Sequence, residues 1–590
     1  METHVNFMFG YFNKMLYIDL NEEKIEELNI NDEVYKKYIG GSGLISYFLS
    51  TMPDVKDLLI LTVGPLTLDN VPNGGRVVIG FVSPETGLFG ETHIGTRFAV
   101  ELKKCGYDGI IIKGKEKIPS YIYIANDKVN IYDAKKYWGM DILQTISSIR
   151  NDLNDKNLKI IAIGPAGERK VKFSVIGNEE GLGGRTGGGA VMGSKNIKAI
   201  VIKGNKEIPI AHPNELKELN KKLINKLLKG GEGLRKNGTG GGLANYYSLG
   251  NIPIKNFYLG YWNDESINKI TGLTLVKNYS GVPFACSLCP IACKKMVTVK
   301  GGKYFDSEVK VRGPEYETLT MLGSNLMIDD LEAIIKGNEL CDNLGLDTIS
   351  TGNVIGFIFE LAEKGLIDKE IDGIELSWGN AESMLKLIKK IAFREGIGDV
   401  LAEGVKAISE KFGGKEFAVQ VKGLENPAHD GRAFFAHALS IATMNRGADH
   451  LGWAHLPYRG FSIPELNIYS SKNRYEDDEN FIKNTIKIQN LMIVYDSLVI
   501  CKYALMAGLT ITDILDLLYH ITGLKYMPED LIRIGNEIWL LQRKINVNLG
   551  MKIDDDYLPP RMLHPHSGRQ DTKVPPIEKW MPIYYKFRGL

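Results

Sequence analysis

The run Leu58-Leu-Ile-Leu-Thr-Val63 is almost wholly aliphatic and lies between an aspartate and a glycine. A short apolar run bounded by turn-forming residues is typical of a buried β-strand. Leu16, Ile18 and Leu20 alternate with polar residues, and the polar stretch 21–24 after them can turn the chain back. The start of the chain is therefore predicted to be β-rich. Similar apolar runs follow at 77–82, 110–112, 121–124, 160–163 and 200–202.

The sequence changes character after His212-Pro213. Asp330 is a predicted helix N-cap, and Gly345 is a predicted helix terminator. The stretch 470–480 is polar without an apolar period, so we expect an exposed loop there. The residues predict a β-rich front and a largely helical remainder. Apolar residues recur at helical spacing in three longer segments, 330–342, 382–392 and 480–497.

The composition excludes several classes of protein. The chain has 590 residues, enough for several domains, and its 72 Lys and Arg against 71 Asp and Glu leave a net charge of +1. That balance gives no support for binding nucleic acid or a membrane through a basic surface. Mean hydropathy is −0.12, and no apolar stretch reaches the ~18 residues of a membrane span. Six cysteines are too few for a disulfide scaffold, and residues 1–10 lack a signal-peptide pattern, so the expected location is cytoplasmic.

Three cysteines form a C-x2-C-x3-C motif at Cys286, Cys289 and Cys293. Thiolates this close suit an iron–sulfur cluster, which needs a fourth ligand from elsewhere in the chain. Zinc is one alternative, although zinc sites usually pair their ligands two and two. Three incidental buried thiols are another. The remaining cysteines are Cys105, Cys341 and Cys501.

Glycine is enriched, with 64 residues, and it concentrates in four loops. Two of these loops carry an arginine, Arg76 in 73–76 and Arg185 in 183–189. Glycine lets a backbone approach a ligand closely, and a guanidinium binds phosphate through two parallel hydrogen bonds. The two loops therefore indicate an anionic cofactor, with tight turns in a β-rich domain as the alternative.

Two carboxylates lie five positions apart in Asp342-Asn-Leu-Gly-Leu-Asp347. A helix that ends near Gly345 would direct both toward one site, and a compensating donor is expected because a carboxylate opposes the dipole there. The segment from Asp496 to Cys501 repeats this frame. Carboxylates accept hydrogen bonds from guanidine-like pterin edges as they do from arginine. The alternative for each aspartate is a solvated helix end.

Together these motifs resemble the tungsten-containing aldehyde:ferredoxin oxidoreductase family, and the resemblance runs through nearly the whole chain. It implies an α+β multidomain fold, with a β-rich pterin-cradling domain at 1–210 and mainly helical domains at 211–417 and 418–590. The anchors of the resemblance are the cysteine triplet and the segments 64–67, 74–76, 163–167, 189–196, 313–317, 342–347, 445–450 and 496–501.

The resemblance implies a bis-pterin tungsten or molybdenum centre beside a [4Fe–4S] cluster, with Mg²⁺ between the pterin phosphates. No protein side chain is expected to ligate the tungsten or molybdenum. The implied cluster ligands are Cys286, Cys289, Cys293 and Cys501. The implied pterin-site residues are Arg76, His93, Arg185, Asp342, Asp347, Asp496 and the Ile500 backbone.

The implied reaction is ferredoxin-dependent oxidation of a small aldehyde to the carboxylic acid. Glu317 would act as general base, and His450 and Tyr316 would donate hydrogen bonds to the carbonyl oxygen. Arg446 is a candidate cation for a phosphate-bearing aldehyde. The expected partner is ferredoxin or a ferredoxin-like electron-transfer subunit, and the chain is a monomer or homodimer. The alternatives are a related enzyme acting on another carbonyl or an aromatic thioester, and a non-catalytic iron–sulfur electron carrier.

The chain departs from the family pattern at three places. His93 stands where some members have asparagine, a change that is tolerable if the backbone carbonyl holds the Mg²⁺. Val499-Ile500 replaces the usual Gly-Leu before the last cysteine. Lys336-Gly-Asn-Glu339 replaces the Glu-x-x-His that holds an extra iron at a dimer interface in some members, so this iron site is predicted to be absent.

Overall fold

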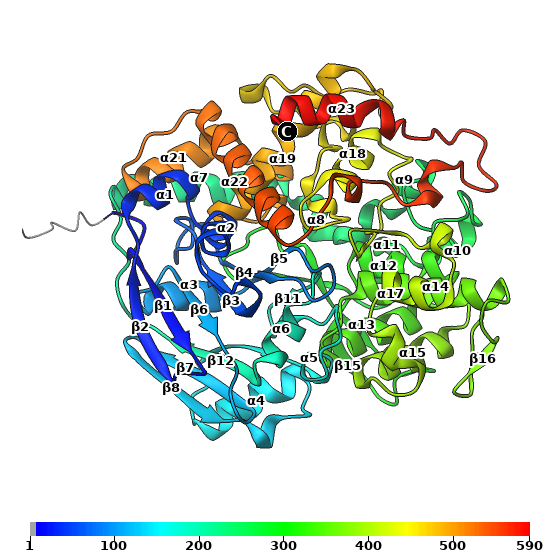
Figure 1. Cartoon of the computed structure of the whole chain (residues 1–590), viewed down its shortest axis with the longest axis horizontal. Coiled ribbons are helices and arrows are strands. Elements are labelled where there is room, and N and C mark those ends of the chain that lie inside the picture. Colours follow the sequence, from blue (N-terminus) through cyan, green and yellow to red (C-terminus); the bar gives the residue numbers. More distant parts are fainter. Residues whose placement is uncertain (1–7) are drawn as a thin grey trace, which may run out of the picture.

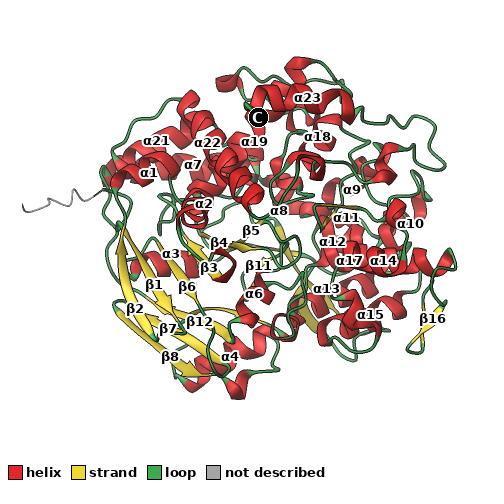
Figure 2. Cartoon of the chain, viewed as in Figure 1, coloured by secondary structure: helices red, strands yellow, loops and turns green. Residues whose placement is uncertain are grey.

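The computed structural model describes residues 8–590. Two β-sheets from the first part of the chain lie on one side of the molecule, and helices from the rest form the other side (Figures 1 and 2). No helix among the described residues is both long and apolar enough to cross a bilayer. The prediction that residues 1–10 form no signal peptide concerns mainly residues 1–7, which lie outside the described part of the chain.

The first sheet has six strands in the order β2-β1-β6-β3-β4-β5. Its opening hairpin is the one expected from the alternating residues, with Ile18 opposite Ile25. Only the β1–β6 pair is parallel among the pairs of this sheet. Its strands are β1 (Lys14–Asp19), β2 (Lys24–Asn29), β3 (Leu58–Thr62), β4 (Arg76–Val82), β5 (Phe89–Gly95) and β6 (Gly109–Lys113).

The second sheet also has six strands, in the order β11-β10-β9-β12-β7-β8. Apolar residues of both sheets and of helix α3 (Phe98–Lys104) form one hydrophobic core, which is why the predicted runs are buried. Every predicted apolar run overlaps a strand, so the β-rich front is confirmed. The strands are β7 (Ser120–Ala125), β8 (Lys128–Asp133), β9 (Lys159–Ile163), β10 (Ile176–Gly177), β11 (Leu182–Gly183) and β12 (Ile197–Lys203).

The three predicted helical segments are helices. Asp330 accepts a hydrogen bond from the amide of Ala333, and Gly345 ends the first of these helices with φ of 85°. The third helix is buried on nearly all sides and packs against α2 (Gly41–Thr51) and α22 (Pro528–Asn548). The helices are α13 (Leu331–Leu344), α15 (Ala381–Phe393) and α19 (Glu479–Leu498).

The largest hydrophobic core contains residues from both predicted helical domains. It includes Leu331 and Leu387 from one side of the predicted boundary, and Leu439 and Ile488 from the other. The two β-sheets followed by helices confirm the predicted α+β fold class. Because the core is shared across residues 417 and 418, the domain boundary at this point stays a prediction.

Each sheet meets the end of one helix at a glycine. Gly64 directly follows Val63 after β3, and a Cβ there would lie 2.4 Å from the carbonyl oxygen of Leu498. Gly164 directly follows β9, and a Cβ there would lie 2.4 Å from the carbonyl oxygen of Leu344. Only glycine allows backbones to approach this closely. The contacts fix the C-terminal ends of α19 and α13, where the two Asp-bearing segments begin.

Candidate active site

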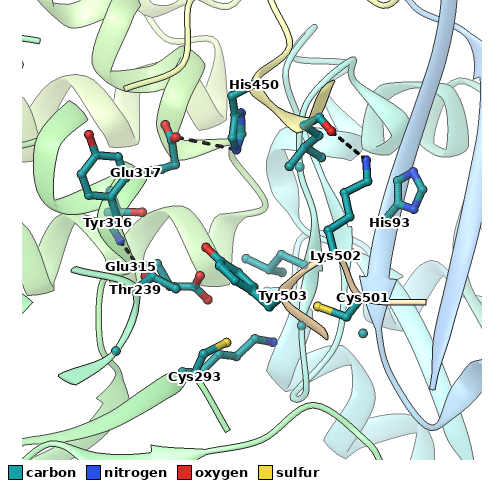
Figure 3. Close-up of a pocket in the computed structure, with 18 of the residues that line it drawn as sticks. His93, Thr239, Cys293, Glu315, Tyr316, Glu317, His450, Cys501, Lys502 and Tyr503 are labelled. Atoms are coloured by element: carbon teal, nitrogen blue, oxygen red, sulfur yellow. Dashed lines mark hydrogen bonds and ion pairs between the residues drawn. The ribbon is translucent and has the colours of Figure 1, made fainter. Parts of the chain in front are cut away.

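A cavity of about 610 Å³ lies between the sheets and the helical part of the chain. Its wall includes every residue that the sequence singled out for the site except Cys289. Figure 3 shows Glu317 and His450 on one side of this cavity and Cys293 and Cys501 on another. Residues from all three predicted domains therefore converge on one space.

The fourth cysteine lies beside the C-x2-C-x3-C motif. The motif occupies the loop between β13 (Val282–Phe284) and β14 (Lys294–Val299). Cys286, Cys289, Cys293 and Cys501 line one small second cavity. Burial, reinforced by Cys501, raises the pKa of Cys289 to about 12. Thiols that resist ionisation without a cation are a suitable donor set for a metal centre, because a coordinated thiol loses its proton.

The other two cysteines lie elsewhere and are fully buried. Cys105 donates a long hydrogen bond to the carbonyl oxygen of Lys203, at 3.5 Å. Burial raises the pKa of Cys341. Neither residue lines either cavity, so the geometry leaves Cys501 as the companion of the triplet.

Arg76 lies between the cysteines and the second Asp-bearing segment. Burial opposes its charge, but Cys501, Cys286 and Asp496 outweigh that effect and raise its pKa. Asp496 itself receives a hydrogen bond from Lys502 at 2.7 Å. Arg76 is thus a partly buried cation placed to contact anionic groups on both sides.

Asp342 and Asp347 line the same cavity, as the spacing predicted. The expected compensating donor is Arg312, whose Nε lies 3.1 Å from a carboxylate oxygen of Asp342. Asp347 differs from the expectation because it begins the next helix, α14 (Thr348–Glu363), and accepts a hydrogen bond from the Ser350 amide at 3.0 Å. Burial raises the pKa of both carboxyl groups.

Arg185 has unused hydrogen-bond donors. One Nη atom donates to the carbonyl oxygens of Glu425 and Ala448. Its Nε and its other Nη are buried and have no hydrogen-bond partner among the described residues. Two free donors on a buried guanidinium fit a bound phosphate or similar anion.

Glu317, near the start of α12 (Tyr316–Met321), has one paired and one unpaired oxygen. Its Oε2 accepts a hydrogen bond of 2.7 Å from the amide of Ala428, whereas its buried Oε1 has no hydrogen-bond partner among the described residues. Oε1 lies 3.7 Å from Nε2 of His450 and 3.5 Å from Nε2 of His429. Burial raises the pKa of Glu317 to about 7 and lowers that of His450 to about 3. The pair therefore combines a titratable carboxyl group with a neutral imidazole near neutral pH.

Tyr316 uses its hydroxyl group differently from the prediction. The hydroxyl donates a hydrogen bond of 2.6 Å to the carbonyl oxygen of Ala428, so its proton is not directed at a substrate in this structure. The backbone amide of the same residue, Ala428, donates to Glu317. Tyr316 thus holds the backbone segment that orients Glu317.

His93 lies among carboxylates. Its Nε2 lies 3.5 Å from Oε1 of Glu91, and its Nδ1 lies 3.7 Å from Oδ1 of Asp496. One ligand atom from each of these three residues falls within 4.8 Å of the others. Glu91 was not foreseen, although its place two residues before His93 on β5 puts both on the same face of the strand.

Sequence reasoning also missed Lys502, Tyr503 and Arg459, and it named His429 only as one of several histidines that flank the region of His450; all four residues line the large cavity. Lys502 and Tyr503 directly follow the last cysteine, a position that could have suggested them (Figure 3). His429 lies next to Ala428 and its ring stacks on Tyr316 with 4.8 Å between centroids. No sequence signal marks Arg459.

Four clustered thiols and a buried acid–base pair around one cavity favour a redox enzyme. Two family models match the chain: "Aldehyde ferredoxin oxidoreductase, N-terminal domain" over residues 15–204, and "Aldehyde ferredoxin oxidoreductase, domains 2 & 3" over residues 215–590. The chain belongs to the aldehyde ferredoxin oxidoreductase family, as the sequence motifs indicated.

Relatives match over almost their full length. A tungsten-containing aldehyde ferredoxin oxidoreductase of Pyrococcus horikoshii is 37% identical over 605 residues, covering 99% of this chain and 96% of the relative. The WOR-like subunit of an aliphatic sulfonate oxidoreductase of Pyrococcus furiosus is 33% identical, and the match covers 96% of this chain and 92% of that subunit. The active-site complex BamBC of benzoyl coenzyme A reductase has the same fold, with a TM-score of 0.82 at 23% identity, covering 99% of this chain and 95% of that chain.

Proposed function

We propose that this protein oxidises an aldehyde to the carboxylic acid at a bis-pterin tungsten centre and passes the electrons through a [4Fe–4S] cluster to ferredoxin. Aldehyde and water give the acid, two electrons and two protons. The family assignment and the near full-length similarity to tungsten-containing aldehyde ferredoxin oxidoreductases support the reaction class.

The residues that would hold the cofactors are in place around the cavity. Arg185 offers its free Nε and Nη to a pterin phosphate, and Asp342, Asp347 and Asp496 offer carboxylate oxygens to the pterin edges. Arg76 would contact both the pterin and the cluster. The bound tungsten centre supplies the two-electron redox chemistry that no side chain of the chain can provide.

Glu317 would remove the proton from the attacking water. A general base is most effective when its pKa lies near the working pH, which fits the pKa of about 7 for Glu317. His450 is neutral near that pH and would donate a hydrogen bond to the carbonyl oxygen as negative charge develops there. Tyr316 would position Glu317 through the backbone of Ala428.

Electrons would leave through the cluster held by Cys286, Cys289, Cys293 and Cys501. The cluster ligands border the substrate cavity through Cys286, Cys293 and Cys501, which line both cavities. When bound, such a cluster would supply the one-electron chemistry that a one-electron carrier requires. Ferredoxin, or a ferredoxin-like subunit, fits that role.

One observation carries the proposal: the unpaired Oε1 of Glu317 faces His450 in the cavity that also reaches the cysteines. An electron carrier without catalytic activity would have no use for a buried, unpaired carboxylate oxygen, whose burial costs free energy.

The test is metal analysis and electron paramagnetic resonance on anaerobically purified protein, followed by dye-linked oxidation of a panel of aldehydes. We expect about four iron and one tungsten per chain, with measurable aldehyde oxidation. Fully metallated protein that oxidises no aldehyde would reject the reaction and favour the carrier alternative. Zinc in place of iron would reject the cluster.

A further inference from the structure

Arg459 brings an unpaired positive charge to the wall of the large cavity. It ends the short helix η7 (Leu456–Arg459) and lines the cavity with Tyr246 and Tyr316. Its guanidinium carbon lies 4.8 Å from the centroid of the Tyr246 ring. This is a cation–π contact, which leaves the N–H donors of the guanidinium available for another partner. Within residues 8–590, Arg459 makes no side-chain hydrogen bond and no carboxylate oxygen lies within 4.0 Å of its nitrogens.

Three other cations in the cavity wall are paired with carboxylates, whereas Arg76 and Arg185 are the cations assigned above to the cofactors. Arg446, Lys502 and Arg312 each have a nitrogen within 3.1 Å of a carboxylate oxygen. Arg446, the cation that the sequence suggested for a phosphate-bearing aldehyde, pairs with Asp449 at 2.5 Å and is buried. Asp449 therefore compensates the charge of Arg446, whereas Arg459 has no carboxylate partner among the described residues.

Arg459 lies on the same side of the cavity as the acid–base pair. The Tyr246 ring on which it stacks lies 5.1 Å from the Tyr316 ring, centroid to centroid. Glu317 is the next residue along the chain (Figure 3). Arg459 and Glu317 therefore border the same cavity, with Tyr246 and Tyr316 beside them in its wall.

We propose that Arg459 binds an anionic group at the far end of the aldehyde, so that the preferred substrates carry a carboxylate, sulfonate or phosphate. This inference rests on the proposed function, because it places the reacting carbonyl group at Glu317. A guanidinium matches each of these anions with paired N–H donors. An uncompensated charge in a partly dehydrated cavity costs free energy, and an anionic substrate removes that cost.

The experiment compares matched substrates that differ in one anionic group. The pairs are succinic semialdehyde with butanal, sulfoacetaldehyde with acetaldehyde, and glyceraldehyde 3-phosphate with glyceraldehyde. We expect at least one anionic member to have the higher kcat/KM, and the pair that shows the largest preference identifies the anion. A preference for the neutral member in all three pairs would overturn the inference.

The variant Arg459→Gln should reduce that preference by about 10- to 100-fold, because a charge-assisted hydrogen bond contributes about 1.5–3 kcal/mol. The loss should appear mainly in KM, and Arg459→Lys should restore part of it. Arg569→Gln removes the same charge from the exposed pair with Asp571 and should keep the preference. An equal loss for both members of the pair would mean a structural role and would overturn the inference.

A binding measurement separates this inference from the proposed function. Titration calorimetry of the holoenzyme should detect succinate binding that is stronger than butyrate binding and that Arg459→Gln abolishes. Equal binding of the two acids would overturn the inference even where aldehydes are oxidised. Metallated protein that oxidises no aldehyde at all would instead overturn the proposed function, and the inference with it.

Discussion

The amide of Ala428 donates a 2.7 Å hydrogen bond to Oε2 of Glu317, and no other described residue donates to either oxygen of this carboxylate. The Ala428 carbonyl oxygen accepts from Tyr316, so the backbone of one residue contacts two successive residues of α12. A single neutral donor is too little to stabilise the carboxylate fully in a buried place, which explains its raised pKa. Glu317 is therefore oriented without being neutralised.

Glu317→Gln should reduce kcat for aldehyde oxidation by about 10²- to 10⁴-fold, the usual contribution of a general base. Glutamine keeps the shape of the side chain and can keep the contact with Ala428, so iron and tungsten contents should not change. Steady-state kinetics with metal analysis measures both. Glu375→Gln, at an exposed position, serves as the control. A metallated Glu317→Gln variant with a near-normal rate would remove Glu317 from the mechanism.

The pH dependence should follow the same carboxyl group. A base must be deprotonated, so kcat/KM should rise with pH through about 7 and then level off. Burial lowers the pKa of His450 to about 3 and also lowers the pKa values of His429 and His455. These three histidines therefore stay neutral near pH 7 and add no second inflection to the pH profile of kcat/KM. A rate that falls as pH rises through 7 would contradict this assignment.

Stability provides an independent check on that pKa. The folded pKa of Glu317 lies above the usual value of about 4.3, so its protonated form is favoured in the folded protein and stability is lost as pH rises toward about 7. Glu317→Gln cannot ionise and escapes that loss. The melting temperature of the variant relative to the wild type should therefore increase across this pH range. A constant difference would mean that the carboxyl group is not perturbed.

Cys501→Ala should abolish the iron–sulfur cluster, because a cubane needs four ligands. Iron should fall well below the roughly four atoms per chain of a cubane, and the signal of the reduced cluster should disappear. Cys341→Ala and Cys105→Ala are matched controls, since both thiols are buried away from the two cavities. Full iron content in Cys501→Ala would exclude Cys501 as a ligand.

The sequence predicted the elements and the members of the candidate site better than their contacts. Apolar period and turn residues gave the strands and the ends of α13, because these depend on local burial and backbone preference. The sequence predicted that a donor would compensate Asp342, but not that this donor is Arg312. Arg446 pairs with Asp449 only three residues away, whereas the placement of Arg459 against Tyr246 in the cavity wall depends on contacts between distant segments that no local pattern encodes.

Backbone conformation also limited the prediction. Val499 stands where the family usually has glycine, and it ends α19 in the left-handed region with φ of 62°. β-branched residues rarely adopt this conformation, so no local pattern predicted this turn at Val499. The buried Val499 side chain packs against Gly41, whose missing Cβ leaves the space. Tertiary packing thus overrides the local preference.

Gly64→Ala and Gly164→Ala should each destabilise the protein and loosen the site. A Cβ at either position would meet a helix-end carbonyl oxygen at 2.4 Å, and backbone cannot move aside as a side chain can. Overpacking of this kind costs about 1–3 kcal/mol of unfolding free energy.

The two substitutions should affect different parts of the site. Because Gly64 contacts Leu498, Gly64→Ala should mainly lower iron content through Cys501. Because Gly164 contacts Leu344, Gly164→Ala should mainly lower pterin content through Asp342 and Asp347. Thermal unfolding together with iron and pterin analysis measures these effects, and Gly233→Ala, with open space around its Cβ, is the control. Equal losses of iron and pterin in both variants would show that the two contacts do not act on separate parts of the site.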